Sequence, residues 1–386
     1  MTPADLLIRP LRGLPEIADN DDLAGLLLDA VERGGDRLKD GDVLVVTSKV
    51  VSKADGLRAD PTHRAAHVLA QARRVVAERL TATGVIRITR TIAGPVLAGS
   101  GIDASNTGPS GQLLLLPSDP DGSAARLRDA LLEAAAARGM TAPDRFGLII
   151  SDTSGRAWRE GVVDFALGAA GLPVIDDLRG SADDDARPLT VTVRAVADEL
   201  ACAADLVTGK AERAPAALVR GWRWPPDDAS AADAVSRGAS ALVRDDAQDW
   251  FAVGHHEAVR AALGVRAGTH DALDVGLRPV GTEELADRVE RAVALARHDG
   301  LGRLPDGHPH ARLAGPRPDP ADARVDVIQH GVRVEAPDDV TLGVVTARLL
   351  VALAGEDVPS ALARTWPRSD VAQACSLVLF LEDAAP

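Results

Sequence analysis

The spacing of apolar residues changes along the first quarter of the chain. Residues 22–38 place leucine, alanine and valine at helical intervals, which predicts an amphipathic helix. Residues 43–46 form an uninterrupted apolar run after an Asp-Gly-Asp turn, which predicts a buried strand. Alanine and arginine dominate residues 61–83, which we predict to be a second amphipathic helix. Residues 84–92 alternate between apolar and polar side chains and predict a half-buried strand.

Strands and helices continue to alternate up to residue 224. The patterns predict strands at 112–117, 146–150 and 216–224, a helix at 123–139, and a strand running into a helix over 188–211. These elements do not follow a strict strand–helix–strand rhythm. The predicted fold class is therefore α/β or α+β.

A change of composition at residues 222–246 predicts a domain boundary. We expect a first domain over 1–240 and a smaller second domain over 246–386. In the second domain the patterns predict helices over 248–263, 282–298 and 338–354, and strands near 325–328 and 376–382.

The charge balance of the chain narrows the possible partners. Its 386 residues carry a net charge of −14, and no basic run offers the surface that nucleic acid requires. The longest apolar stretch, residues 342–355, is interrupted by Arg348 and is too short to span a membrane. Residues 1–17 lack a signal-peptide pattern, and the two cysteines form neither a disulfide framework nor a zinc motif. We expect a soluble, cytoplasmic protein.

Two histidine pairs are candidate metal ligands. Neither His255-His256 nor His308-Pro309-His310 has acidic or cysteine partners at helical spacing, so we interpret both pairs as surface residues. The sequence also has no phosphate-binding loop with the spacing Gly-x4-Gly-Lys-Ser/Thr.

The stretch LIISDTSGRAWREG, residues 148–161, carries the first candidate chemistry. Its apolar run ends abruptly in Asp152 and Thr153, followed by a glycine, Arg156 and Arg159. Burying a carboxylate is costly unless a cation balances it. Two interpretations follow: either Asp152 or Ser154 caps a helix after the strand, or Asp152 binds a cation.

Two other polar stretches extend this inventory. Residues 45–53, VVTSKVVSK, place Ser48, Lys49 and Lys53 after a strand, with the lysines on one face of a helix, where they either meet a polyphosphate or remain solvated. Asp103 and Asn106 lie in a glycine-rich loop, where they either form an Asx turn or approach a ligand. Together these groups suit a hard divalent ion that bridges phosphate oxygens.

Six ordered stretches over about residues 8–222 resemble the coenzyme F420:L-glutamate ligase family. They read LRGLPEI, DGDVLVVTSKVVSKADG, GIDASNTG, SDTSGRAWREG, AVADELACAADLVTGKA and VRGW. The resemblance implies an enzyme that uses GTP to add L-glutamate to the F420 precursor through an acyl phosphate. It also implies a divalent metal, Mg²⁺ or Mn²⁺, and a homodimer.

The resemblance assigns roles to individual positions. Those that match the family's GTP contacts are Leu14, Pro15, Glu16, Ile17, Ser48, Lys53 and Asn106. Those that match its metal ligands are Asp103, Asp152 and Thr153. Our own inference is that Arg156 and Arg159 act in catalysis by facing the anionic substrate or its phosphates.

One departure concerns the acceptor. The family commonly has Gly-Gln-Thr-Asp where this chain has Gly161-Val162-Val163-Asp164, so two polar residues near the site are valines. The alternatives are therefore a related GTP-dependent amide ligase that acts on another small carboxylate, and a non-catalytic nucleotide-binding homologue.

The second domain resembles a shortened form of the nitroreductase-like domain that follows the ligase domain in actinobacterial members. Its roughly 140 residues lack the arginine-rich opening that normally meets the flavin phosphate. We therefore expect a degenerate α+β domain that binds no FMN. The alternative is an unrelated helical appendage.

Overall fold

The computed structural model describes residues 5–108, 111–209, 213–224, 237–281, 283–298, 318–329, 331–362 and 375–381. The chain forms two compact units. Unit 1 comprises residues 1–73 and 90–249, and unit 2 comprises residues 74–89 and 250–386. The segment 74–89 thus belongs to the same unit as the C-terminal part of the chain.

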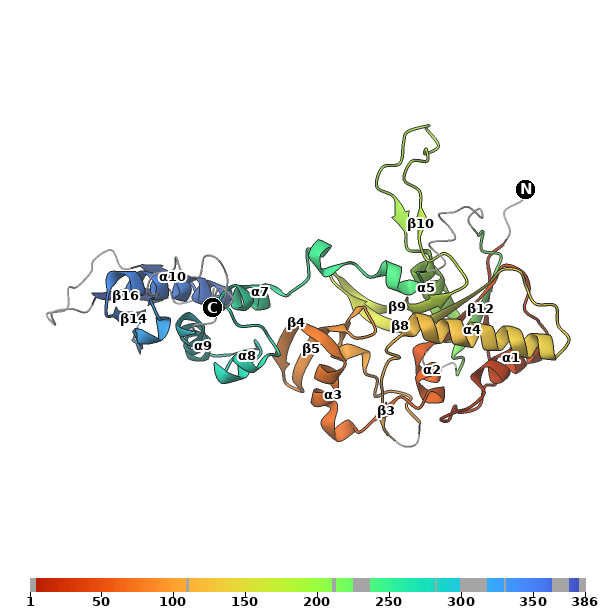
Figure 1. Cartoon of the computed structure of the whole chain (residues 1–386), viewed down its shortest axis with the longest axis horizontal. Coiled ribbons are helices and arrows are strands. Elements are labelled where there is room, and N and C mark those ends of the chain that lie inside the picture. Colours follow the sequence, from red (N-terminus) through yellow and green to blue (C-terminus); the bar gives the residue numbers. More distant parts are fainter. Residues whose placement is uncertain are drawn as a thin grey trace, which may run out of the picture. The chain divides into compact units, whose positions relative to one another are not determined.

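A mixed five-stranded sheet forms the centre of unit 1, in the order β1-β12-β2-β8-β9 (Figure 1). The strands are β1 (Leu7–Leu11), β12 (Ala216–Arg220), β2 (Asp42–Thr47), β8 (Phe146–Arg156) and β9 (Arg159–Ala170). β2 and β8 run parallel, with Thr47 opposite Ser151, and the other neighbours are antiparallel. The carboxyl end of β2 therefore lies beside the polar part of β8.

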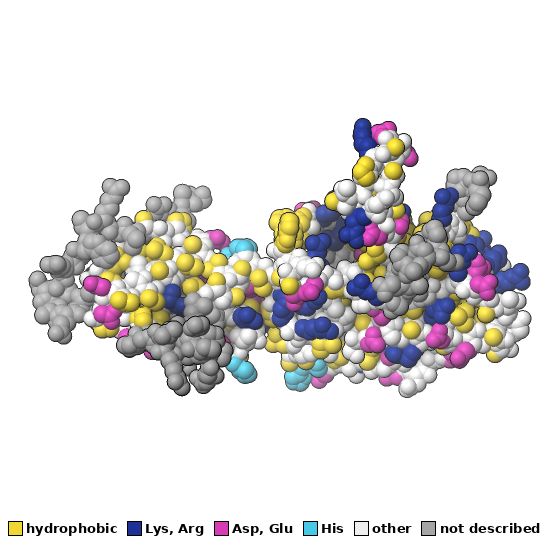
Figure 2. Space-filling view, turned by 45° about the horizontal axis from the view of Figure 1, so that its top comes forward, with side chains coloured by type: hydrophobic (Ala, Val, Ile, Leu, Met, Phe, Trp, Pro, Cys, Tyr) yellow, Lys and Arg dark blue, Asp and Glu magenta, His cyan; other side chains and the backbone are white. Residues whose placement is uncertain are grey.

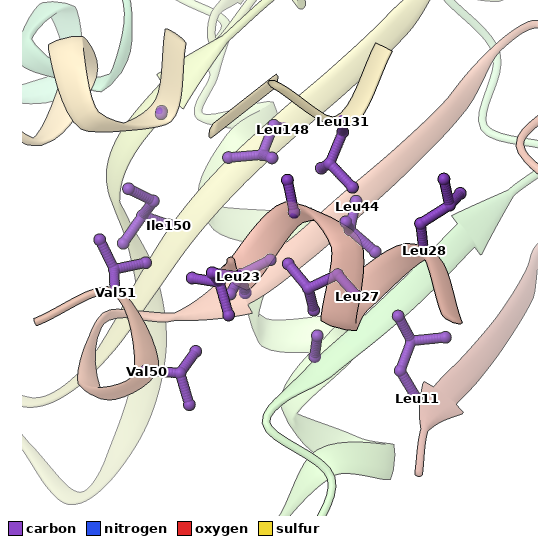
Figure 3. Close-up of a cluster of buried hydrophobic side chains, with 14 of the residues drawn as sticks. Leu11, Leu23, Leu27, Leu28, Leu44, Val50, Val51, Leu131, Leu148 and Ile150 are labelled. Carbon is purple, nitrogen blue, oxygen red and sulfur yellow. The ribbon is translucent and has the colours of Figure 1, made fainter. Parts of the chain in front are cut away.

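Helices cover both faces of this sheet. Alternate residues of β2 point to opposite sides: Leu44 packs with α1 (Leu23–Arg33) and α4 (Pro120–Ala137), and Val45 packs with α5 (Val196–Thr208). Figure 3 shows leucines of α1, β2, β8 and α4 converging in the first of these cores. Strands covered on both faces need continuous apolar sequences, which is why these two strands read as uninterrupted runs.

The elements predicted over residues 22–224 are largely confirmed, with one clear error. The helix predicted over 61–83 is wrong: α3 (Arg64–Ala70) stops after seven residues and β4 (Ala72–Thr81) follows. β4 pairs with β5 (Gly84–Thr91), and Val75 and Val76 are buried. Strand pairing therefore overrides the helix preference of the alanines and arginines, because β-branched residues pack well in a sheet. The strand predicted over 112–117 is only β7 (Leu113–Leu114).

Short elements complete unit 1. They are α2 (Ser48–Ala54), β3 (Arg58–Ala59), η1 (Pro61–His63), β6 (Val96–Ala98), η2 (Gly99–Gly101), β10 (Asp176–Asp177), β11 (Val193–Arg194), η3 (Ala239–Leu242) and η4 (Asp246–Gln248). The α2 helix begins directly after β2, so its first residues lie at the carboxyl end of that strand.

Unit 2 combines an antiparallel sheet with helices around its own core. The sheet order is β13-β14-β16-β15, from β13 (Arg324–Ile328), β14 (Gly331–Ala336), β16 (Cys375–Leu381) and β15 (Ser360–Leu362). The helices are α7 (His255–Ala262), α8 (His270–Asp274), α9 (Leu285–Arg297), η6 (Pro320–Asp322) and α10 (Asp339–Gly355). The predicted helices near α7, α9 and α10 are confirmed, whereas β14 and β15 were not predicted.

The longest apolar helix of unit 2 is a core element. α10 buries Leu342, Val345, Leu349 and Leu353, while Arg348 donates hydrogen bonds to backbone carbonyls of Leu263, Leu295 and Ala296.

Among the described residues, no helix is long and apolar enough to cross a membrane. On the face that Figure 2 shows, acidic and basic side chains are interspersed.

Candidate active site

A cavity of about 810 Å³ opens at the carboxyl ends of β2 and β8 in unit 1. Open α/β sheets commonly bind ligands at this edge, and the volume suits a small-molecule site. Four groups of side chains line it: Leu14–Ile17, Lys49 and Lys53 of α2, the loop residues Asn106–Gly108, and Ser151, Thr153 and Asp164 of the β8–β9 hairpin. The cavity thus brings together stretches separated by more than a hundred residues.

The two lysines of α2 have different partners. Lys53 is buried, with 6% of its surface exposed, and forms an ion pair with Glu16. Lys49 lies one turn earlier, and its Nζ is 2.7 Å from Oδ2 of Asp103. Because both ammonium groups line the cavity and Lys53 is buried, the alternative of a solvated lysine pair is wrong for Lys53.

Asp103 is held in its loop by a local turn and by Lys49. Its Oδ1 accepts hydrogen bonds from the backbone nitrogen of Ser105, at 2.6 Å, and from the Ser105 hydroxyl, at 2.8 Å, so the Asx turn is present. Burial raises the pKa of Asp103, but the hydrogen bonds from Lys49 and Ser105 outweigh it and hold the pKa below its usual value. Asp103 is therefore a fixed, ionised carboxylate.

Asp152 lies in a more acidic environment. Burial, and the nearby carboxylates of Asp103 and Asp164, raise the pKa of Asp152 to about 7, although hydrogen bonds from Thr153 and Ser48 oppose the shift. The neighbouring charges with the largest effect on the pKa of Asp152 are therefore negative, like the Asp152 carboxylate itself. Such a carboxylate is stabilised by a cation, which would offset the repulsion.

The polar end of β8 continues as a strand. β8 extends to Arg156 and turns back into β9, with Thr153 opposite Asp164. The alternative in which Asp152 or Ser154 caps a helix is therefore wrong, because a strand and not a helix follows. Across the hairpin, the Asp164 carboxylate accepts hydrogen bonds from Ser151, at 2.9 Å, and from Thr153, at 2.7 Å.

Asp164 is the main site residue to which the sequence interpretation gave no role. It is 7% exposed, lines the cavity and fixes the Thr153 hydroxyl, and its backbone oxygen accepts from the Cys202 thiol at 2.9 Å. The sequence contains a signal for this contact. Gly155 and Gly161 flank the turn of a hairpin, and a hairpin places the residues before its turn opposite those after it. The last turn of α5, with Asp205 and Thr208, also lines the cavity.

The remaining predicted residues divide between the cavity and its surroundings. Leu14, Pro15, Glu16, Ile17, Lys53, Asn106 and Thr153 line it. Ser48, Asp103 and Asp152 are not part of the lining, and Ser48 donates a hydrogen bond to Asp152. Arg156 and Arg159 are exposed and are not part of the lining. They lie opposite each other in the backbone register at the tip of the β8–β9 hairpin.

The donor set fits a hard divalent cation. Asp103 and Asp152 offer carboxylate oxygens, the ligand type that Mg²⁺ and Mn²⁺ prefer. Thr153 gives its hydroxyl hydrogen to Asp164, so its oxygen lone pairs remain available for a cation. Asp164 would therefore orient Thr153 toward such a cation, as outer groups of metal sites commonly do for a ligand.

Comparison with known proteins assigns the chain to a family of ligases. The model of the F420-0:Gamma-glutamyl ligase family matches residues 13–221, which is more than half of the chain. The chain therefore belongs to this family, and the protein is an enzyme of the ligase class. The matched range contains every site residue predicted from the sequence.

Three archaeal relatives carry the name coenzyme F420:L-glutamate ligase. The protein of Natronomonas pharaonis is 38% identical over 267 residues, which cover 64% of this chain and 97% of the relative. That of Archaeoglobus fulgidus is 40% identical over 227 residues, or 55% and 86% of the two chains. That of Halobacterium salinarum is 41% identical over 239 residues, or 56% and 88%.

Proposed function

We propose that the enzyme joins L-glutamate to the coenzyme F420 precursor in a GTP-dependent reaction. Family membership supports the substrates, since the relatives are named for this ligation. One observation supports nucleotide dependence: Lys49, Lys53 and Asp164 line one cavity, and next to them Asp103 pairs with Lys49 and Asp152 is affected by the charges of Asp103 and Asp164. This combination of fixed positive charge and metal-binding oxygens suits a nucleotide triphosphate.

In this proposal the Leu14–Ile17 segment, Ser48, Lys53 and Asn106 form the nucleotide end of the site. Lys53 is the central residue, because a buried ammonium whose carboxylate partner Glu16 is 61% exposed can turn to a phosphate at little cost. Asn106 adopts a left-handed backbone conformation, with φ of 54°, in a loop that brings the backbone close to the cavity.

The chemistry requires an activated carboxyl group. A carboxylate oxygen of the F420 precursor attacks the γ-phosphorus of GTP, and the bond to the bridging oxygen breaks, giving an acyl phosphate and GDP. The glutamate amine then attacks the acyl carbon and loses a proton to the surroundings, while the C–O bond breaks and inorganic phosphate leaves. The enzyme's residues hold the reactants in line and balance the phosphate charge.

Asp103, Asp152 and Thr153 would hold the Mg²⁺ or Mn²⁺ ion. A bound ion of this type screens the phosphate oxygens during transfer. Asp164 keeps Thr153 in its rotamer, and Lys49 keeps Asp103 in place. Arg156 and Arg159, exposed at the hairpin tip, would contact the anionic acceptor or its phosphates from the solvent side.

Val162 favours a second candidate, a related amide ligase with another small carboxylate acceptor. It replaces a polar family residue and is 60% exposed on β9, two residues from Asp164. A change of polarity at this position alters the surface that an acceptor approaches.

Phosphate release tests the proposal. Purified protein would be incubated with GTP, Mg²⁺ or Mn²⁺, L-glutamate and the F420 precursor, with omission of each component as the control. We expect GDP, phosphate and a glutamylated product only in the complete mixture. Turnover with a different carboxylate would favour the second candidate, and GTP binding without turnover would indicate a non-catalytic homologue.

The proposal extends to unit 2 and to assembly. We infer that unit 2 is a shortened nitroreductase-like domain without FMN, in keeping with its four-stranded antiparallel sheet and the buried helix α10. We also infer a cytoplasmic homodimer. Light scattering of the purified protein, with twice the chain mass expected, tests the assembly.

A further inference from the structure

Two histidines and one carboxylate meet in unit 2, outside the ligase site. His255 and His256 form the first turn of α7, and Asp357 follows the end of α10. One ligand atom from each residue lies within 4.8 Å of the other two. The surface interpretation is wrong for His256, which is 6% exposed, because α7 packs against the end of α10.

The hydrogen bond of His256 determines which nitrogen can bind an ion. Its Nδ1 lies 2.6 Å from the backbone oxygen of Gly355. A carbonyl oxygen only accepts, so in the neutral ring Nδ1 carries the hydrogen and Nε2 keeps its lone pair. A backbone carbonyl on the distal nitrogen is also the usual outer contact of a metal-binding histidine.

The distance between His256 and Asp357 suits two ligands of one ion. Nε2 of His256 is 3.8 Å from Oδ2 of Asp357, too far for a hydrogen bond. Metal–ligand bonds of about 2.0–2.2 Å place neighbouring ligand atoms about 3–4 Å apart. The His255 ring lies beside that of His256, with ring centroids 3.8 Å apart, and one of its ligand atoms lies within 4.8 Å of those of His256 and Asp357.

The backbone that presents Asp357 is held rigidly. A Cβ on Gly355 would lie 2.4 Å from Cγ1 of Val259, so only glycine allows α7 to approach this closely. The next residue, Glu356, is 2% exposed and accepts hydrogen bonds from the guanidinium groups of Arg260 and Arg291. Asp357 itself has φ of 53°, a conformation that glycine usually occupies after a helix.

We propose that His255, His256 and Asp357 form a second metal site, which binds a transition-metal dication such as Zn²⁺. Imidazole and carboxylate ligands together suit Zn²⁺, Co²⁺ and Ni²⁺, whereas Mg²⁺ prefers oxygen ligands alone. His255 and Asp357 are exposed, so the ion can enter from solvent and water can complete its coordination. The bound ion joins the start of α7 to the end of α10 and stabilises unit 2.

Zinc titration of the full-length protein tests the site. The titration is carried out by calorimetry, with excess Mg²⁺ present to occupy the oxygen-ligand site of unit 1. We expect one equivalent of Zn²⁺ to bind, and His255→Asn and Asp357→Gly each to weaken binding at least about tenfold. Co²⁺ gives a second readout, since its visible absorption reports direct nitrogen coordination and disappears in the same variants.

Neither variant should destabilise the metal-free protein, so a loss of zinc binding would not reflect a loss of folding. His255 and Asp357 are exposed, and glycine at position 357 relieves the left-handed backbone, so the metal-free Tm of Asp357→Gly should not fall. His63→Asn is the matched control, because exposed His63 lies 3.6 Å from Asp60 but belongs to no group of three possible ligands among the described residues. A second control replaces His308 and His310, which lie outside the described residues, with asparagine. Zinc binding that is absent, or equal in wild type and both site variants, overturns the proposal.

Discussion

Thr153 donates its hydroxyl hydrogen to Oδ1 of Asp164, at 2.7 Å, across the β8–β9 hairpin. The same carboxylate accepts from Ser151, so one aspartate sets the direction of two hydroxyl groups at the cavity. The orientation of Thr153, a predicted metal ligand, therefore depends on Asp164, which lies eleven positions later in the chain.

Asp164→Asn tests this dependence. The amide keeps the shape of the side chain but weakens its hold on the two hydroxyl groups, so we expect Mn²⁺ affinity or ligase activity to fall about 10–100-fold. Mn²⁺ titration and the phosphate-release assay measure the two effects. Asp176→Asn, which removes a carboxylate paired with Arg194 at 3.4 Å, should leave both unchanged. Equal effects of the two substitutions would contradict the role of Asp164.

Asp152→Asn should abolish metal-dependent activity without destabilising the metal-free protein. Burial and the carboxylates of Asp103 and Asp164 raise the pKa of Asp152 to about 7, above the ordinary value of about 3.9 in the unfolded chain. An acid with a raised folded-state pKa lowers stability as pH rises from about 4 to 7, and the neutral amide avoids that loss. We expect the Tm of the variant in chelator at pH 8 to equal or exceed that of wild type. A clearly lower Tm would show that Asp152 stabilises the metal-free fold.

Lys53→Ala should raise the KM for GTP about 10–100-fold, the loss expected when a charged hydrogen bond to phosphate is removed. The substitution leaves Glu16 without this partner, but Glu16 is 61% exposed, so the free energy of folding should change little. Steady-state kinetics and GTP calorimetry measure the effect. Lys39→Ala is the control, since Lys39 is exposed and its ion pair with Asp36 is long, at 4.0 Å. Unchanged GTP affinity in Lys53→Ala would place the phosphates elsewhere.

Arg220→Met should destabilise unit 1 by about 3–5 kcal/mol, because it leaves the buried carboxylate of Asp42 without its cation. Arg220 also holds Asp36 at 2.9 Å. Burial raises the pKa of Asp36, but hydrogen bonds from Arg220 and Arg37 outweigh it and lower the pKa. This contribution is present above about pH 4 and is lost as pH falls through the lowered pKa.

Urea unfolding at pH 7 and at about pH 3 should therefore show a smaller difference between wild type and Arg220→Met at the lower pH. Arg145→Met is the control. It removes an exposed pair with Asp40 at 3.4 Å and should cost at most about 1 kcal/mol. A difference that does not depend on pH would argue against the Asp36 contribution.

The purified protein should be colourless, and FMN should not shift its Tm. In the described part of unit 2, the buried guanidinium groups of Arg260 and Arg291 are engaged by Glu356, and Arg348 donates to backbone carbonyls. These groups are not available to a flavin phosphate. GTP with Mg²⁺ is the positive control, since it should raise the Tm through unit 1. A flavin absorbance band near one equivalent per chain would refute this prediction.

The sequence alone determined the elements whose signal is local. β2 and the first half of β8 are apolar runs because both faces of the sheet are covered, and α1, α4 and α5 show helical spacing or alanine-rich faces because one side packs on that sheet. The ordered motifs from LRGLPEI to VRGW likewise indicated the family, since each is a contiguous stretch. Apolar runs, helical spacing and contiguous motifs can all be recognised within a short window of residues.

Only the tertiary structure decided the features that depend on partners outside a residue's own helix or strand. β4 is a strand because β5 pairs with it, Asp164 acquires its role from a hairpin that returns to Thr153, and His256 is buried because α7 meets the end of α10. Pairing and burial energies come from residues that are remote in sequence, so they can override the local preference of a segment. That is why the helix predicted over 61–83 and the surface position predicted for His256 both failed.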